Sequence, residues 1–259
     1  MSNNGPMQLA YEERGSGQAL VFVHGFPLDR RMWIEQLRGL AKVRRCVAID
    51  LRGHGLSAIS DPDPVFSMDL FADDVAITLD ELGADQADVC GLSMGGYVAF
   101  AFWRRHRDRV RSLILCDTKA EADSDEAKAG REKTGQLVRE QGLEALWDGL
   151  GPKLLATDPK PDDVERLRET FLAQPAVVIA ADALAMRDRP DSTPDLGGID
   201  VPVLWVHGEE DQLMPIAGAR ATAEKIPGAR FAAIPAGGHM APMENAAAAN
   251  EAIGAFLKG

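Results

Sequence analysis

The stretch CGLSMGGY, residues 90–97, decides how the rest of the chain is interpreted. An apolar run typical of a buried strand ends just before Ser93, and an apolar run typical of a helix begins just after it. Glycines stand two positions before and two positions after the serine, at Gly91 and Gly95. A turn this tight from strand into helix leaves no room for side chains at those positions. The pattern predicts a serine lifted clear of the sheet, beside the unpaired amides of a helix N-terminus.

Short apolar runs alternate with helical patterns on both sides of this turn. Runs rich in β-branched and other apolar residues predict buried strands, and segments of helical periodicity predict helices between them. The predicted strands cover 19–25, 46–51, 87–92, 110–117, 201–208 and 229–235, and the predicted helices cover 32–40, 67–82, 94–106, 216–226 and 243–258. Strand–helix alternation of this kind builds a mostly parallel sheet with helices on both faces.

The alternation stops between about residues 118 and 196. This segment has no convincing strand pattern, and its periodicity predicts four successive helices, at 126–142, 143–156, 162–174 and 176–189. Because the strand pattern resumes afterwards, we predict a helical insertion into one domain instead of a second domain on a linker. The expected core is 1–117 and 197–259, and the expected helical cap is 118–196.

Length, charge and composition exclude several classes of partner. At 259 residues the chain has the length of one large α/β domain, and its net charge of −12 argues against nucleic acid, because phosphate binding needs clustered Lys and Arg. No run approaches the length of a membrane span, and the polar start resembles no signal peptide. The three cysteines lie in or beside apolar runs, as buried thiols do. We therefore expect a cytoplasmic protein that binds neither nucleic acid nor membrane; self-association into a homo-oligomer is left open.

A serine hydroxyl needs a base before it can act as a nucleophile, and the chain has five histidines. His239 lies in the glycine-rich stretch PAGGHMAPMEN, just after the last predicted strand. A loop there lies at the carboxyl edge of the sheet, where ligands bind in open α/β folds. We therefore predict His239 as the general base. No catalytic role is assigned to the other four histidines, His24, His54, His106 and His207.

The base in turn needs a carboxylate that fixes its tautomer and stabilises the imidazolium. The stretch GEEDQLMP follows a predicted strand, and within it Asp211 is the best candidate for the partner of His239. Glu209 and Glu210 compete for the same role, and Asp117, at the end of LILCD, is a reserve position on a neighbouring strand.

The tetrahedral intermediate of acyl transfer carries an oxyanion that two fixed N–H groups must stabilise. Met94 follows the serine directly and supplies one of these amides. The second is expected from the early stretch VFVHGFPLD, where Gly25 frees the backbone and the amide of Phe26 can face the site.

The identity of the nucleophile decides which chemistry is expected. A serine that attacks an alkyl carbon gives an ether, which is a dead end, whereas a serine that attacks an acyl carbon gives an ester that activated water can hydrolyse. Ser93 therefore favours acyl chemistry and argues against the opening of alkyl halides or epoxides. This chemistry needs no metal, nicotinamide or flavin, so no cofactor is expected. The acidic stretches DPDP and DSDE lack the spacing of a calcium loop.

With HGFPLD, DLRGHGLS, GLSMGG, HGEEDQLMP and GGHMAPMEN in this order, the chain resembles the capped, cofactor-free serine esterases of the α/β-hydrolase superfamily. The similar proteins include carboxylesterases and 3-oxoadipate enol-lactonases. The chain order Ser93, Asp211, His239 matches that family. The resemblance implies an α/β-hydrolase fold with an eight-stranded, mostly parallel sheet flanked by helices. Two of its strands are short and N-terminal, one within QLAYEERG and one just before ALVFV, and the helical cap covers the active site.

We therefore expect a carboxylic ester hydrolase that uses a Ser-His-Asp triad and an acyl-enzyme on small to medium, mostly apolar molecules. Three alternatives use the same triad: a 3-oxoadipate enol-lactonase-like enzyme, a C–C bond hydrolase and a perhydrolase. A ligand receptor that keeps the fold and turns over little is a more distant alternative.

The substrate pocket is the least readable part of the sequence, because most apolar residues at helical spacing belong to a core. The apolar candidates for its wall are Trp33, Trp147, Leu150, Leu154, Phe171, Ile179 and Met186. A substrate that carries a carboxylate would need a cation in the pocket instead, and the cap offers Arg131, Lys153 and Arg187.

Overall fold

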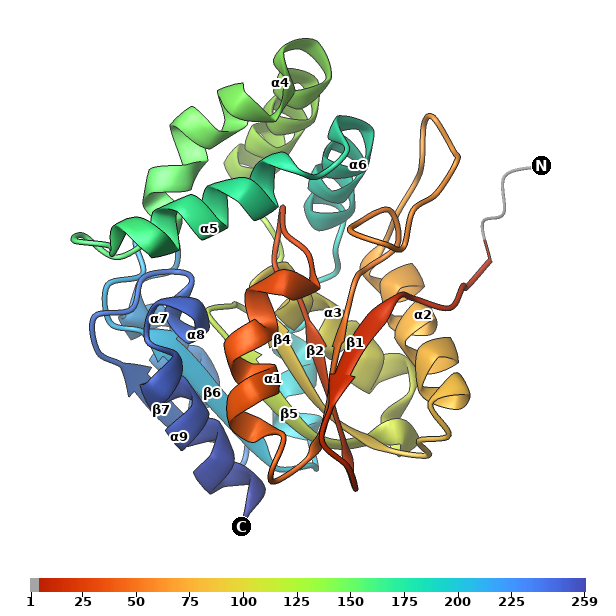
Figure 1. Cartoon of the computed structure of the whole chain (residues 1–259), viewed down its shortest axis with the longest axis vertical. Coiled ribbons are helices and arrows are strands. Elements are labelled where there is room, and N and C mark those ends of the chain that lie inside the picture. Colours follow the sequence, from red (N-terminus) through yellow and green to blue (C-terminus); the bar gives the residue numbers. More distant parts are fainter. Residues whose placement is uncertain (1–4) are drawn as a thin grey trace.

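A central sheet with helices on both faces forms the body of the molecule, and a layer of helices lies over one end of it (Figure 1). The computed structural model describes residues 5–259. The seven strands of this part of the chain are β1 (Tyr11–Arg14), β2 (Ala19–Val23), β3 (Arg45–Ile49), β4 (Ala87–Leu92), β5 (Val110–Cys116), β6 (Val203–Gly208) and β7 (Arg230–Ile234). Their order in the sheet is β1-β3-β2-β4-β5-β6-β7. The β1–β3 pair is antiparallel and every other neighbouring pair is parallel.

The mostly parallel α/β-hydrolase sheet is confirmed, but the expected number of eight strands is wrong for residues 5–259. Strand β1 is the short strand expected within QLAYEERG. No further strand precedes β2 in the described residues, because only residues 15–18 separate β1 from β2. Two of those four residues, Gly15 and Gly17, both have φ of 89°, which is turn geometry and not extended backbone.

The helices of the body cover both faces of the sheet. They are α1 (Ile34–Leu40), α2 (Met68–Glu81), α3 (Met94–Arg105), α7 (Ile216–Ala223), α8 (Ala241–Glu244) and α9 (Ala246–Leu257). Helices α1 and α9 pack together on one face, and α2 and α3 pack together on the other (Figure 1). Every residue of β2 and of β4 is therefore buried, which explains why these strands read as unbroken apolar runs.

Local sequence signals explain where two of these helices begin. The side chain of Ser67 accepts a hydrogen bond of 3.0 Å from the amide of Leu70 and caps α2. The single helix expected at 243–258 is divided at Asn245, whose φ of −126° and ψ of 65° are not helical. The Asn245 side chain accepts from the amide of Ala248 and so caps α9.

The segment expected to form the cap, 118–196, is the helical layer over the sheet (Figure 1, green to teal). Its helices are α4 (Asp125–Leu150), α5 (Pro161–Leu172) and α6 (Ala176–Arg187), with short 3₁₀ turns at Gly151–Leu154 and Thr193–Gly198. The first two helices expected here are both contained in α4, and the boundary expected between residues 142 and 143 is confirmed: the helical path breaks at Gly142, where φ is 79° and ψ is −175°. Such a conformation is open almost only to glycine.

The cap leaves the core and returns to it at one narrow neck. The amide of Ser192 donates a hydrogen bond of 2.9 Å to the carbonyl of Ala120. An ion pair of 2.8 Å between Arg189 and Asp123 reinforces this closure, and both side chains are buried. The two ends of the inserted segment are therefore fastened to each other.

A buried ion pair joins the cap to the core at a second place. His54 lies in the loop after β3, and its Nε2 is 2.8 Å from Oδ2 of Asp182 in α6, with both side chains fully buried. Nδ1 of His54 donates a hydrogen bond of 3.1 Å to the carbonyl of Arg52. Burial alone would lower the pKa of His54, but the charge of Asp182 raises it above its usual value. The contact with Asp182 thus favours the charged form of His54, and the pair joins the cap to the core.

Between residues 5 and 259, no single helix is both long and apolar enough to cross a bilayer. Helices α5 and α6 reach that length and composition only when taken together, and a bend of 95° separates them.

Candidate active site

Ser93 stands at the junction of β4 and α3 with φ of 52° and ψ of −110°, a conformation that non-glycine residues rarely adopt. Its neighbours hold it there from both sides. The Ser93 amide donates to the carbonyl of Cys116 at 2.9 Å, and the hydroxyl of Thr118 donates to the carbonyl of Ser93 at 2.8 Å. Strain of this kind persists only where surrounding contacts impose it, and it is concentrated at functional sites.

The two glycines around Ser93 are required by close backbone packing. A Cβ atom on Gly91 would overlap the carbonyl of Gly95, and a Cβ atom on Gly95 would overlap the carbonyl of Val23 in β2. The turn can therefore form only if both positions lack a side chain, as the G-x-S-x-G spacing indicates.

His239 lies in the loop between β7 and α8 and is hydrogen-bonded to Asp211, in the turn after β6. Its Nδ1 is 2.8 Å from Oδ2 of Asp211. The other carboxylate oxygen of Asp211 accepts from the amides of Leu213 and Met214 at 2.8 and 2.9 Å. Burial would raise the pKa of Asp211, but the charge and hydrogen bond of His239 and the Met214 amide bring it below its usual value. The ionised carboxylate fixes Nδ1–H and leaves Nε2 as the basic nitrogen.

The three competing carboxylates lie elsewhere. Glu209 is exposed, and Glu210 accepts a hydrogen bond of 3.0 Å from the amide of Thr157 in the cap. Asp117 is fully buried and accepts from the amide of Gly208 at 2.7 Å. Burial and the nearby charge of Asp211 raise the pKa of Asp117 well above its usual value, which favours the neutral form of this carboxyl.

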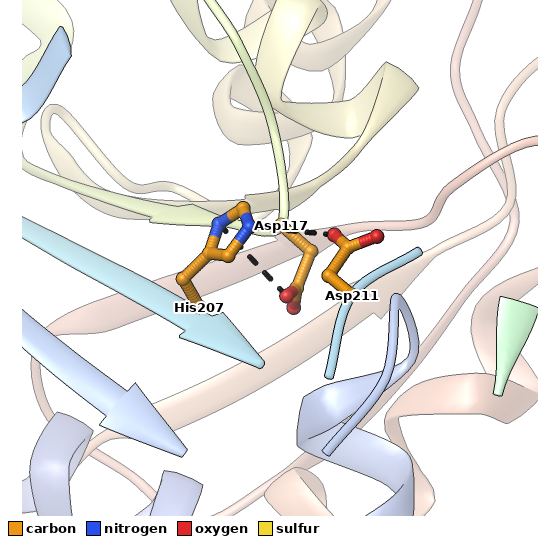
Figure 2. Close-up of side chains that lie close together, drawn as sticks. All are labelled: Asp117, His207 and Asp211. Carbon is orange, nitrogen blue, oxygen red and sulfur yellow. Dashed lines mark ion pairs between the residues drawn. The ribbon is translucent and has the colours of Figure 1, made fainter. Parts of the chain in front are cut away.

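Asp117 and His207 form a buried cluster behind Asp211 (Figure 2). Nε2 of His207 lies 2.6 Å from the carbonyl of Met214 and 3.4 Å from Oδ2 of Asp211, and Nδ1 lies 4.0 Å from Oδ1 of Asp117. The three side chains are close enough to share a metal ion. However, both oxygens of Asp211 and Nε2 of His207 already have protein partners, so we interpret the cluster as support for the Asp211 turn.

The remaining histidines have structural contacts outside this turn. His24 is fully buried, and burial and the charge of His54 lower its pKa to about 3. Its Nε2 accepts from the amide of Leu51 at 3.0 Å. His106 lies 2.8 Å from Asp73 near the end of α3. His239 is thus the one histidine that shares a cavity with Ser93 among residues 5–259.

Of the two amides expected to bind the oxyanion, one directly follows the serine in the chain and the other belongs to the loop after β2. Met94 is the first residue of α3, and Phe26 lies in the loop after β2, with its side chain on the cavity wall. Neither amide donates a hydrogen bond to another protein group in the part of the chain that the structure describes. Both N–H groups therefore remain available to a ligand.

A cavity of about 350 Å³ connects Ser93 and His239 with the underside of the cap. Residues from both parts of the chain line it. The core contributes Phe26, Ser93, Leu213, Met214 and His239, and the inserted segment contributes Lys119, Asp123, Ala127, Gly130, Arg131, Thr134, Leu150, Leu154 and Met186. Ser93 is 8% exposed and His239 is 3% exposed, so both are nearly shielded from bulk water.

The apolar residues expected on the pocket wall divide into two groups. Leu150, Leu154 and Met186 line the cavity. The other four are packed against other side chains instead. Trp33 lies in the body, with its ring centroid 5.1 Å from that of Phe22. Trp147 and Phe171 pack edge-on against each other in the cap at 5.3 Å, and Ile179 is fully buried in α6. Helical periodicity cannot separate a residue that faces a cavity from one that faces a neighbouring helix.

The polar part of the cavity wall was only partly foreseen. Of the cations suggested for a carboxylate-bearing substrate, Arg131 lines the cavity, whereas Lys153 and Arg187 do not. Lys119 and Asp123 were missed, although both closely follow β5, one of the strands that carries the site at its carboxyl end. Position after a strand was the signal that could have found them.

Comparisons with known proteins identify the family of this chain. A family model described as the alpha/beta hydrolase fold matches residues 18–246. The solved esterase from Thermogutta terrifontis with malate bound is 40% identical, over 96% of this chain and 93% of that one, with a TM-score of 0.93. The enol-lactonase from Burkholderia xenovorans LB400 is 29% identical, over 97% of this chain and 96% of that one, with a TM-score of 0.88. The 3-oxoadipate enol-lactonase 2 of Acinetobacter baylyi is 29% identical, over 93% of this chain and 88% of its own length. The chain belongs to the α/β-hydrolase family and is similar to its esterases and enol-lactonases.

Proposed function

We propose that this protein hydrolyses carboxylic esters, with Ser93 as nucleophile, His239 as general base and Asp211 as the carboxylate that orients the base. One observation carries the proposal: the strained serine and the Asp211-bound histidine open into the same shielded cavity. The esterase and enol-lactonase relatives support it, because both names describe acyl transfer to water.

The proposed reaction has two halves. As the Ser93 hydroxyl oxygen attacks the ester carbonyl, Nε2 of His239 takes its proton, and the amides of Phe26 and Met94 stabilise the oxyanion. The intermediate collapses, and the imidazolium returns the proton to the departing alcohol. Water then attacks the acyl-enzyme, gives a proton to His239, and Ser93 leaves with that proton as the free acid forms.

The cavity favours a substrate of small to medium size. Its volume of about 350 Å³ lies near the lower end of ordinary ligand pockets, which begin at roughly 300 Å³. Leu150, Leu154 and Met186 give part of the wall an apolar surface. That the enzyme works in the cytoplasm on a small molecule, without a cofactor or nucleic acid, stays a prediction from the sequence.

Lactone hydrolysis is a second candidate function. A lactone is an intramolecular ester, so the same nucleophile, base and oxyanion donors would open it. The enol-lactonase relatives favour this candidate.

Turnover of p-nitrophenyl esters from acetate to decanoate tests the proposal. We expect the wild type to prefer short to medium chains, and Ser93→Ala and His239→Ala to lose about 10⁴-fold or more in kcat. His106→Gln, which changes a histidine remote from the cavity, is the matched control and should keep its turnover. Ester hydrolysis that survives Ser93→Ala would refute the mechanism. A fluorophosphonate should phosphonylate Ser93 in the wild type, adding the mass of the reagent less that of HF, and should leave the mass of Ser93→Ala unchanged.

A further inference from the structure

The cavity above Ser93 contains positive charge that the proposed ester hydrolysis does not use. Lys119 follows β5, and Arg131 lies in the first turns of α4. Both line the cavity, with 33% and 26% of their side chains exposed. A serine nucleophile, a histidine base and two backbone amides complete the acyl transfer, so these two cations must be explained separately.

Asp123 is the one acidic side chain on the cavity wall, and three cations share it. Its oxygens lie 3.2 Å from Nζ of Lys119, 3.0 Å from Nε of Arg131 and 2.8 Å from Nη2 of Arg189. Burial would raise the pKa of Asp123, but Arg189 and Arg131 hold it well below its usual range. Asp123 is therefore ionised at neutral pH, and its single negative charge is set against three positive ones.

Arg189 is committed to the protein and does not line the cavity. Its side chain is buried, stacks 4.1 Å above the ring of Tyr97, and donates to the carbonyls of Met186 and Glu121. Lys119 and Arg131 make no ion pair other than the one with Asp123 among residues 5–259. The wall thus carries two cations and one anion, which leaves an excess of positive charge facing the cavity.

The orientation of Arg131 leaves its recognition groups free. Arg131 uses Nε to reach Asp123, and its two terminal nitrogens donate to no protein acceptor in the described chain. A guanidinium presents its N–H groups as a rigid fork that matches the two oxygens of a carboxylate. Asp123 holds that fork in place, so little side-chain entropy remains to be lost when an anion binds.

We propose that Lys119 and Arg131 form an anion subsite, and that the preferred substrate is an ester or lactone carrying a free carboxylate. This inference rests on the proposed function, because it assigns a substrate class to the same cavity. The carboxylate would neutralise the excess charge of the wall while the ester carbonyl lies at Ser93. An uncharged ester of the same length would displace water from these partly buried cations without replacing its hydrogen bonds, which is unfavourable.

Matched pairs of esters test the proposal directly. Monomethyl adipate and methyl hexanoate have the same acyl length and differ in a terminal carboxylate; 4-acetoxybutyrate and butyl acetate place that difference on the alcohol side. Hydrolysis is followed by pH-stat titration. We expect kcat/KM to favour the charged member in at least one pair. A preference for the neutral member in both pairs would overturn the proposal.

Substitutions assign the preference to residues. Arg131→Gln should reduce the charged-to-neutral ratio of kcat/KM by about 10- to 100-fold, and Lys119→Gln should reduce it by a smaller factor. Arg131→Lys keeps the charge without the fork and should restore part of the ratio. Arg187→Gln is the matched control, because Arg187 also belongs to the cap but lies outside the cavity and pairs with Glu132 and Asp188. A ratio unchanged by both Arg131→Gln and Lys119→Gln would overturn the assignment.

Binding measurements separate this inference from the proposed function. Calorimetry of glutarate with the wild type and with the two Arg131 variants needs no turnover. One outcome is that the wild type binds glutarate, Arg131→Gln does not, and no ester is hydrolysed. That outcome would support the anion subsite and contradict the proposed esterase activity. Hydrolysis of neutral esters, without glutarate binding and without a charged-ester preference, would leave the esterase and refute the subsite. If Arg131→Gln does not fold, as judged by circular dichroism, Arg131→Lys and Lys119→Gln still give the ratio.

Discussion

The core and the cap contribute to the active site by different means. The core places its chemical groups in turns directly after strands, where hydrogen bonds and glycine packing fix the backbone: Ser93 after β4, Asp211 after β6 and His239 after β7. The cap contributes side chains from α4 and α6 that form the wall of the cavity. The comparison teaches that, in the proposed esterase, reactivity depends on backbone geometry, whereas selectivity depends on which helical side chains reach the cavity.

The largest expected effect separates Asp211 from its neighbour Asp117. Asp211→Asn should lower kcat by about 10⁴-fold, because an amide no longer fixes the reactive tautomer of His239 or stabilises its charged form. Asp117→Asn should lower it by less than about tenfold, since the pKa of this buried carboxyl is raised toward the neutral form and its hydrogen bond is to the amide of Gly208 instead of His239. Both variants are compared by p-nitrophenyl butyrate kinetics. Equal losses would mean that the two acids act as one unit.

A second prediction contrasts glycines of the core and the cap. Gly95→Ala should lower the free energy of unfolding by about 4 kcal/mol, or prevent folding, because its Cβ would overlap the carbonyl of Val23. Gly149→Ala, in α4 with open space around its Cβ, should instead stabilise the protein by about 0.5 kcal/mol. Urea denaturation measures both changes. A harmless Gly95→Ala would show that the backbone at the nucleophile can relax.

A third prediction concerns the ion pair between core and cap. The folded-state pKa of His54 is raised, so its contribution to stability is fully present below the unfolded value of about 6.5 and is lost as the pH rises through the folded value. The wild type should therefore lose stability on the alkaline side of pH 6.5. Asp182→Asn should be less stable than the wild type by about 3 kcal/mol at pH 6, with a flatter dependence above it. Thermal melts from pH 5 to pH 9 give the profile, and parallel profiles for the two proteins would contradict the role of the pair.

The smallest expected effect tests how firmly the cavity wall is anchored. Glu244, between the histidine loop and the cap, accepts hydrogen bonds from the amides of Gly238 and Ala156 at 2.8 and 2.7 Å. Glu244→Gln keeps one acceptor oxygen and should lower kcat/KM by about threefold to tenfold, mainly through kcat, because the His239 loop loses one of its supports. Glu251→Gln, the same change at an exposed position of α9, is the surface control. An unchanged kcat in Glu244→Gln would show that the loop is held by other contacts.

Much of this division between core and cap could be predicted from the sequence. The glycine spacing around Ser93 and the stretches that end strands gave the sheet class and the positions of Asp211 and His239, because strand-end motifs depend on local backbone sterics. The boundary between the first two cap helices at Gly142 was predicted as well, whereas the division of the last helix at Asn245 was not. Asparagine is a common helix cap, but the alanine run after Asn245 reads equally well as the interior of one helix.

The charged wall of the cavity was harder still to predict. Arg131 was one of three suggested cations, and nothing in its spacing separates it from Lys153 and Arg187, which lie outside the cavity. For Lys119 and Asp123 the one signal is their position soon after β5. Lys119, Asp123 and Arg131 come to line one cavity because of the path of the chain at the neck. There Arg189, near the C-terminal end of the cap, pairs with Asp123, near its N-terminal end.

The fastened neck between Ala120 and Ser192 also bears on how such a fold can diversify. The two ends of the inserted segment are already hydrogen-bonded to each other. The residues between them can therefore be lengthened, shortened or exchanged with little change in the entropic cost of closing the loop. The inserted segment is in this sense a unit that can be replaced without changing the sheet. A graft that joins another helical segment at these two positions would give the same nucleophile a different set of walls.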